Sequence, residues 1–251
     1  MLNAPKTPWL IRPRPNPQAR LRLFCFPYAG GGASMYRTWA TAVPADIDLC
    51  SVQLPGRENR IAHTPISRWH PLVETLAAEL GPFLDRPFAF FGYSMGALIS
   101  FELARALAQA NAPAPAHMHV AAYRAPQLPS ATPAIHHLAD AQFIAELRQL
   151  KGSPEDVLNN AELMELILPV LRADFAVCET HSCAPGPLLS CPLTVLGGLD
   201  DPLAPRASLE AWATHTSGAF QVRMYPGGHF FWHRAGDLLF NEVLQDLRRI
   251  L

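Results

Sequence analysis

The length, composition and charge of the chain exclude several classes of protein. The chain has 251 residues, 49% of them hydrophobic, and a formal net charge of -1 at pH 7. A chain of this length buries a large core without disulfides or metal ions, so we expect one large α/β domain, with or without an inserted subdomain. The near-zero charge and the lack of a basic block argue against a nucleic-acid-binding protein.

The N-terminus and the cysteines indicate the cellular location. No segment approaches the roughly 18 apolar residues of a membrane span, and the N-terminus has no apolar signal-peptide region. The cysteines are odd in number and irregularly spaced, which gives neither a disulfide framework nor a zinc pattern; they are Cys25, Cys50, Cys178, Cys183 and Cys191. We therefore expect reduced thiols, a cytoplasmic location and no membrane partner.

Strand and helix patterns alternate along most of the chain. Residues 1–20 are rich in proline, which predicts an extended arm that lies on the surface or is disordered. After it the sequence predicts strands over 21–26, 47–54, 88–91, 120–123, 193–196 and 221–225, and helices over 34–42, 69–84 and 97–109, with a last helix near the C-terminus. Such alternation is typical of a parallel sheet covered on both faces by helices.

The alternation stops between residues 126 and 185. Helical segments are predicted near 140–150, 153–159 and 161–178, with no convincing strand between them. We interpret residues 126–185 as a helical lid inserted over the carboxyl ends of the strands. The α/β core then comprises residues 21–125 and 186–251.

Residues 92–96, with the pattern Gly-x-Ser-x-Gly, carry the clearest chemical signal. They lie between an apolar strand and a helix, the context in which this motif holds a serine nucleophile on a strained turn. The hydroxyl of Ser94 is then exposed above the sheet. The alternative is an ordinary strand–helix turn bounded by glycines; the strand, the helix and both glycines together favour the nucleophile.

A serine nucleophile needs a general base and an acid that orients it. The chain order Ser, Asp or Glu, His leaves His215, His229 and His233 as candidate bases. His229 is favoured because it follows a predicted strand in the loop Pro-Gly-Gly-His. For the acid, the loop after the strand 193–196 offers Asp200 and Asp201, of which the spacing of the loop favours Asp201.

Two backbone N–H groups are needed for the oxyanion. One belongs to Met95, the residue after the nucleophile. The other comes from the loop after the first long strand, from Ala29 or Gly30, where three glycines let the backbone approach a ligand. The loop matches neither nucleotide-binding pattern, and the spacing of His229 and His233 lacks the glutamate of a zinc protease, so we expect no metal.

Seven segments together resemble type II thioesterases, the free-standing editing enzymes of nonribosomal peptide and polyketide synthases, within the α/β-hydrolase superfamily. They run in family order along almost the whole chain: Phe-Pro-Tyr-Ala-Gly-Gly at 26–31, Gln-Leu-Pro-Gly-Arg at 53–57, Gly-Tyr-Ser-Met-Gly at 92–96, Arg-Ala-Pro at 124–126, Leu-Arg-Ala-Asp-Phe at 171–175, Gly-Leu-Asp-Asp-Pro at 198–202 and Gly-His-Phe at 228–230. The second and fifth are the most specific.

The resemblance implies a hydrolase of acyl groups held on the phosphopantetheine of carrier proteins, with Ser94, Asp201 and His229 as its triad and no cofactor. The alternatives are a medium-chain fatty-acyl carrier thioesterase, a general esterase, an acyltransferase or a noncatalytic partner protein. We expect a monomer whose partners are acyl or peptidyl carrier domains.

Four further residues are candidates for the substrate site or the lid. The family often has histidine where this chain has Tyr28 and Tyr93, so these residues are expected to change the polarity near the oxyanion hole and the choice of substrate. Arg57 is expected to fix its loop by pairing with a carboxylate. Asp174 is expected to tie the lid to the core, and both also remain candidates for contact with substrate or carrier.

Overall fold

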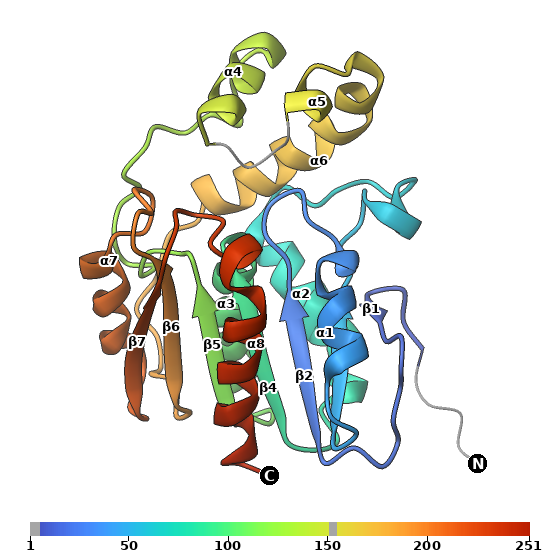
Figure 1. The fold of residues 1–251 in the computed structure, drawn as a ribbon, viewed down its shortest axis with the longest axis vertical. Helices are drawn as coiled ribbons and strands as arrows, with labels where there is room; N and C mark the ends of the chain where they lie inside the picture. The colour runs from blue at the N-terminus through green and yellow to red at the C-terminus, as the bar shows by residue number, and fades with distance from the viewer. Residues whose placement is uncertain (1–5, 151–154) are drawn as a thin grey trace.

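The computed structural model describes residues 6–150 and 155–251, and its centre is a mostly parallel sheet (Figure 1). The seven strands lie in the order β1-β3-β2-β4-β5-β6-β7, and only the pairing of β1 with β3 is antiparallel. The strands are β1 (Leu10–Ile11), β2 (Leu21–Phe26), β3 (Ile47–Val52), β4 (Phe88–Tyr93), β5 (His117–Ala121), β6 (Leu193–Gly198) and β7 (Phe220–Tyr225).

Helices cover both faces of this sheet, which confirms the predicted α/β class. The helices of the described residues are α1 (Arg37–Ala42), α2 (Trp69–Leu80), α3 (Met95–Gln109), α4 (Asp140–Leu150), α5 (Glu155–Leu158), α6 (Ala161–Glu179), α7 (Arg206–Glu210) and α8 (Trp232–Arg248), with short 3-10 turns at Ala33–Tyr36, Glu58–Arg60, Gly81–Phe83 and Ala211–His215. None of the helices in the described residues combines the length and apolar character that crossing a membrane requires.

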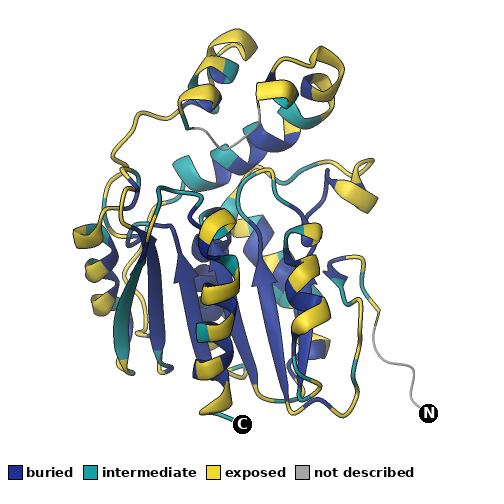
Figure 2. Cartoon of the chain, viewed as in Figure 1, coloured by how far each residue is buried: buried dark blue, intermediate teal, exposed yellow. Residues whose placement is uncertain are grey.

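Side-chain alternation along β2 shows how the sheet divides the core. Phe24 and Phe26 pack with residues of α2 and α3, whereas Leu23 and Cys25 pack with residues of α1 and α8. Successive side chains of a strand point to opposite faces, so a strand covered on both sides is expected to be mostly apolar on both faces. This is why β2 is buried along its whole length. In Figure 2 the central strands of the sheet are buried, whereas the edge strand β7 is mostly of intermediate burial.

Helices α4, α5 and α6 lie beyond the carboxyl ends of the strands, at the top of Figure 1. They have a small core of their own, which includes Phe143, Leu147, Met164 and Leu171. Their outer surfaces are largely exposed (Figure 2). The start of the helix predicted over 153–159 lies outside the described residues; its remainder is α5.

The N-terminal arm is more firmly packed than the sequence predicted. Its described part, residues 6–20, includes β1, which extends the sheet, and Trp9, which is buried. The Arg60 guanidinium lies 4.2 Å from the centre of the Trp9 ring. Prolines flank β1 without entering it, and an edge strand tolerates proline nearby because one side of it makes no ladder hydrogen bonds.

The strand predicted over 120–123 is β5, which begins three residues earlier, at His117, and ends two residues earlier, at Ala121. His117 and His119 alternate with apolar residues in it, and both imidazoles are buried. His117 Nε2 lies 2.9 Å from Thr194 Oγ1, and His119 Nε2 lies 3.0 Å from Asp246 Oδ2. The two histidines therefore have partners that only the fold supplies, and a sequence pattern that counts histidine as polar misses this strand.

Candidate active site

Ser94 occupies the sharp turn between β4 and α3, at the centre of the sheet. Its φ of 52° and ψ of -118° are a strained combination for a residue with a side chain. A Cβ atom on Gly92 would overlap the carbonyl of Gly96, and one on Gly96 would overlap the carbonyl of Phe26. Both flanking glycines are thus required by the close approach of backbone around the serine.

The loop after β7 places His229 against Ser94. His229 Nε2 lies 3.0 Å from Ser94 Oγ, and its Nδ1 lies 2.9 Å from Asp201 Oδ2. A carboxylate at Nδ1 stabilises the tautomer in which that nitrogen carries the proton and Nε2 can accept one from the serine. The structure therefore joins Ser94, His229 and Asp201 in one chain of hydrogen bonds.

The alternative candidates lie elsewhere. Asp201 is only 3% exposed and its second oxygen accepts the N–H of Leu203 at 2.9 Å, whereas Asp200 is exposed. His215 is bound to the side chain of Gln127, and His233 is exposed on α8. Of the candidate bases and acids, His229 is the one hydrogen-bonded to Ser94 and Asp201 is the one hydrogen-bonded to His229.

The backbone N–H groups of Met95 and Ala29 are available to an oxyanion. In residues 6–150 and 155–251 neither N–H donates to a protein acceptor. The N–H of Gly30, by contrast, donates to Asp174 Oδ2 at 2.7 Å. The sequence offered Ala29 or Gly30 as the second donor. Among the described residues, the N–H of Ala29 is the one of the two that is free.

Arg57 and Asp174 form a buried two-pronged ion pair. Arg57 Nη1 lies 2.7 Å from Asp174 Oδ2, and Nη2 lies 2.8 Å from Oδ1. Arg57 follows β3 and Asp174 lies on α6, so the pair ties the helical insertion to the core. Arg57 was expected to pair with a carboxylate, and Asp174 was expected to tie the lid to the core. The structure shows that the two residues pair with each other.

Gln53 belongs to the same group of contacts, and the sequence analysis did not single it out. Its side chain is fully buried, accepts the N–H of Ala33 at 2.7 Å and donates to the carbonyl of Arg57 at 2.9 Å. It thus fixes the loop after β3 against the loop after β2. A polar residue at the end of an apolar strand, directly before Leu-Pro-Gly, is the signal that points to it.

The two tyrosines occupy different positions. Tyr28 is partly exposed and its ring packs against Phe230 at a centroid distance of 5.5 Å. Tyr93 is fully buried, and its hydroxyl donates to the backbone carbonyl of His229 at 2.6 Å. Tyr93 was expected among the substrate-site residues near the oxyanion hole; its side chain instead is buried and hydrogen-bonded to the loop that carries His229, and an effect on the choice of substrate stays a prediction.

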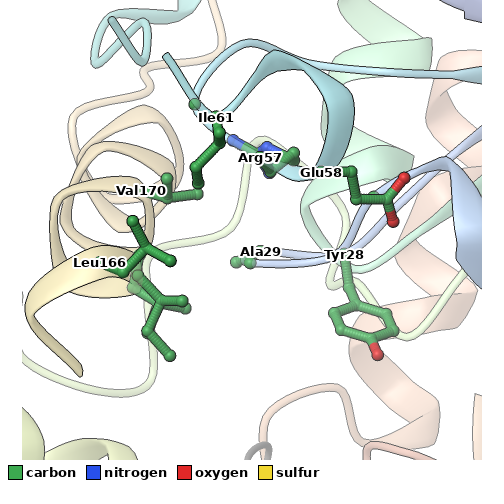
Figure 3. Close-up of a pocket in the computed structure, with 12 residues that line it drawn as sticks. Tyr28, Ala29, Arg57, Glu58, Ile61, Leu166 and Val170 are labelled. Carbon is green, nitrogen blue, oxygen red and sulfur yellow. The ribbon is translucent and has the colours of Figure 1, made fainter. Parts of the chain in front are cut away.

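Two cavities flank this site. The first, of about 540 Å³, lies between the loop at Tyr28–Gly30, the loop at Arg57–Ile61 and α6. Figure 3 shows Leu166 and Val170 of α6 with Ile61, across the cavity from Ala29. The second cavity, of about 660 Å³, is lined by His229, by the loop after β6, by the first turn of α8 and by the end of α4.

Among the described residues one group of side chains has the composition of a metal site: His117, His119 and Asp246, whose ligand atoms lie within 4.8 Å of one another. The two imidazole rings are stacked nearly parallel, at 12° and 4.3 Å. A metal lies in the plane of each imidazole that binds it, so two stacked parallel rings cannot share one ion without turning. We interpret the group as a buried hydrogen-bonded network.

Comparison with known proteins shows the family and the fold to which the chain is similar. The sequence matches the thioesterase domain family over residues 21–251. It is 46% identical over 243 residues to the gramicidin S biosynthesis protein GrsT of Aneurinibacillus migulanus, covering 97% of this chain and 95% of that protein. The fold is similar to that of the type II thioesterase BorB from the borrelidin biosynthetic cluster, with a TM-score of 0.86, 36% identity, and coverage of 94% of this chain and 96% of that one.

A further solved structure gives the same result. RedJ, a thioesterase from the prodiginine biosynthetic pathway in Streptomyces coelicolor, aligns with a TM-score of 0.85 and 37% identity, covering 97% of this chain and 90% of that one.

Proposed function

Because this chain belongs to the thioesterase family and is a hydrolase that acts on thioesters, we propose that it releases acyl groups from the phosphopantetheine of carrier proteins during nonribosomal peptide or polyketide biosynthesis. The pathways named for its relatives support this substrate class. The partner is then an acyl or peptidyl carrier domain, and the role is the removal of stalled or wrong acyl units.

The observation that carries the proposal is the hydrogen-bonded chain from Ser94 through His229 to Asp201, beside two free backbone N–H groups. Ser94 Oγ attacks the thioester carbonyl while His229 Nε2 takes the hydroxyl proton. The new C–O bond gives a tetrahedral oxyanion, which the N–H groups of Met95 and Ala29 stabilise. Asp201 stabilises the imidazolium that has formed.

The intermediate then collapses and the C–S bond breaks. His229 gives its proton to the departing sulfur, so the carrier leaves with a free thiol and Ser94 keeps the acyl group as an ester. In the second half His229 takes a proton from water, whose oxygen attacks the ester. The C–O bond to Ser94 breaks, the serine regains its proton, and the carboxylic acid is released. The scheme uses water and protein groups, with no cofactor.

The test is Ser94→Ala against a panel of acyl groups on carrier proteins, with free esters alongside. We expect hydrolysis to fall by several orders of magnitude and an acyl adduct of the wild-type enzyme to appear in intact mass spectra and be absent from the variant. Ser100→Ala is the matched control: this serine is buried in α3 and hydrogen-bonds the carbonyl of Ala97.

Three outcomes contradict different parts of the proposal. Near-normal turnover by the Ser94→Ala enzyme contradicts the assignment of Ser94 as the nucleophile. A wild-type enzyme that prefers medium-chain fatty acyl carriers overturns the biosynthetic role and favours fatty-acid metabolism. A wild-type protein that neither hydrolyses any thioester nor reacts with a fluorophosphonate probe is a noncatalytic partner.

A further inference from the structure

The two cavities lie on opposite sides of the nucleophile, as judged by the order of the strands in the sheet. Ser94 follows β4. The first cavity is built on the loops after β2 and β3, on one side of β4, and the second on the loops after β6 and β7, on the other. The two parts of a thioester, the acyl group and the thiol, thus have two different places to lie.

The chemistry of the reaction assigns the thiol to the second cavity. The group that protonates a leaving group must lie next to it, and in this site that group is His229. His229 lines the second cavity, whereas Ala29, one of the oxyanion donors, lines the first. The carbonyl oxygen therefore points toward the first cavity and the sulfur toward the second.

From this arrangement we propose that the second cavity receives the phosphopantetheine arm and that Arg234 binds its phosphate group. The inference rests on the proposed function, since it concerns the leaving group of that reaction. Arg234 lines the second cavity, is exposed, and pairs with no carboxylate in the described part of the chain. A guanidinium with free donors is well suited to a phosphate.

The position of Arg234 in its helix also needs an explanation. It lies in the first turn of α8, where no acidic residue is present. The positive end of the helix dipole disfavours a cation there, so Arg234 is not placed to stabilise the helix. A bound anion relieves this repulsion and pairs with the side chain.

The first cavity does not have the charges that a phosphate requires. Its arginine, Arg57, is already neutralised by the two bonds to Asp174, and Glu58 adds a negative charge to the wall. The remaining lining is largely apolar, from α6 and Ile61, which suits an acyl chain (Figure 3). In the second cavity Asp200 is the opposing charge, and its exposure to water weakens that effect.

The experiment compares two substrates with the same acyl group: S-hexanoyl pantetheine and S-hexanoyl 4′-phosphopantetheine. For Arg234→Gln we expect KM to rise about tenfold on the phosphorylated substrate, with kcat unchanged and with no change on the unphosphorylated one. Added salt should raise the wild-type KM for the phosphorylated substrate and leave that of the variant nearly constant. Arg234→Lys, which keeps the charge, should restore part of the affinity.

Arg248→Gln is the control, because Arg248 is exposed on the same helix, roughly 20 Å further along its axis. Equal effects of Arg234→Gln on both substrates, or no effect on either, would overturn the phosphate contact. If the wild-type enzyme hydrolyses neither substrate nor any acyl carrier, the proposed function has failed instead, and the two failures are distinguishable.

Discussion

The Tyr93 hydroxyl donates a 2.6 Å hydrogen bond to the backbone carbonyl of His229, from the position directly before the nucleophile. Burial raises the pKa of Tyr93, so the hydroxyl stays protonated and remains a donor at every working pH. The last residue of β4, directly before Ser94, thereby also holds the loop that carries the general base. Tyr93, one of the two positions at which the family resemblance led us to expect histidine, thus holds the loop of His229.

Tyr93→Phe removes this bond and leaves a buried carbonyl without its donor. We expect kcat to fall about tenfold with little change in KM, because the histidine is less well fixed while the substrate cavities are untouched. Steady-state kinetics on one acyl carrier substrate checks this. Tyr36→Phe is the control, since Tyr36 makes an equivalent buried bond to the carbonyl of Phe26 at 2.6 Å. A larger loss of kcat in the control would contradict the positioning role.

Exchanging each neighbouring aspartate separates the two candidate acids. Asp201→Asn favours the wrong imidazole tautomer of His229, and we expect kcat to fall by about 10⁴ with the fold intact. Asp200→Asn should keep kcat within about twofold of the wild type, because Asp200 is exposed and the carboxylate that is hydrogen-bonded to His229 Nδ1 is that of Asp201. Turnover with a saturating acyl carrier decides between them, and an inactive Asp200→Asn enzyme would reverse the assignment.

Removing Asp174 should affect both stability and activity. Asp174→Ala leaves Arg57 as an unpaired buried cation, which costs about 3–5 kcal/mol of the free energy of unfolding. It also takes the acceptor from the Gly30 N–H, next to the Ala29 donor, so kcat should fall as well. Denaturant titration and kinetics measure the two effects.

Asp140→Ala on the same helical insertion is the comparison for Asp174→Ala. Asp140 pairs with Arg172 at 2.6 Å, but its side chain is 70% exposed, so we expect a change within about 1 kcal/mol. A similar loss of the free energy of unfolding in both variants would show that the burial of the Arg57–Asp174 pair does not determine its contribution to stability.

The buried histidine pair makes the fold sensitive to acid. Burial lowers the pKa of His117 to about 3, below its ordinary value near 6.5. Between these two values the unfolded chain binds a proton that the folded chain does not, so stability falls as the pH falls. The contribution amounts to about 3 kcal/mol between pH 7 and pH 4.

His117→Asn should therefore reduce the slope of the free energy of unfolding against pH over this range by the contribution of this one histidine, as urea titrations at several pH values would show. His137→Asn, at an exposed position, should leave the slope of the wild type unchanged. If His117→Asn keeps the full slope, His117 is protonated in the folded protein and the neutral assignment is wrong.

Much of the fold was readable in the sequence because its signals are local. The apolar runs, the glycines of residues 92–96 and the helix patterns each depend on neighbours in the chain, and they predicted the alternating architecture and the helices found as α4 and α6. The misplaced strand at β5 shows the limit. His117 and His119 can be buried in a strand because their imidazoles hydrogen-bond Thr194 on β6 and Asp246 on α8, which are distant in the sequence.

The sequence by itself determined the strained serine turn, since two glycines and a strand–helix junction leave the backbone few alternatives there. It also limited the base and the acid to a few candidates near His229 and Asp201. Only the tertiary structure decided between Ala29 and Gly30, paired Arg57 with Asp174, and turned Tyr93 toward the histidine loop. Each of these depends on groups that are distant in sequence and meet within hydrogen-bond reach once the sheet and the insertion are packed.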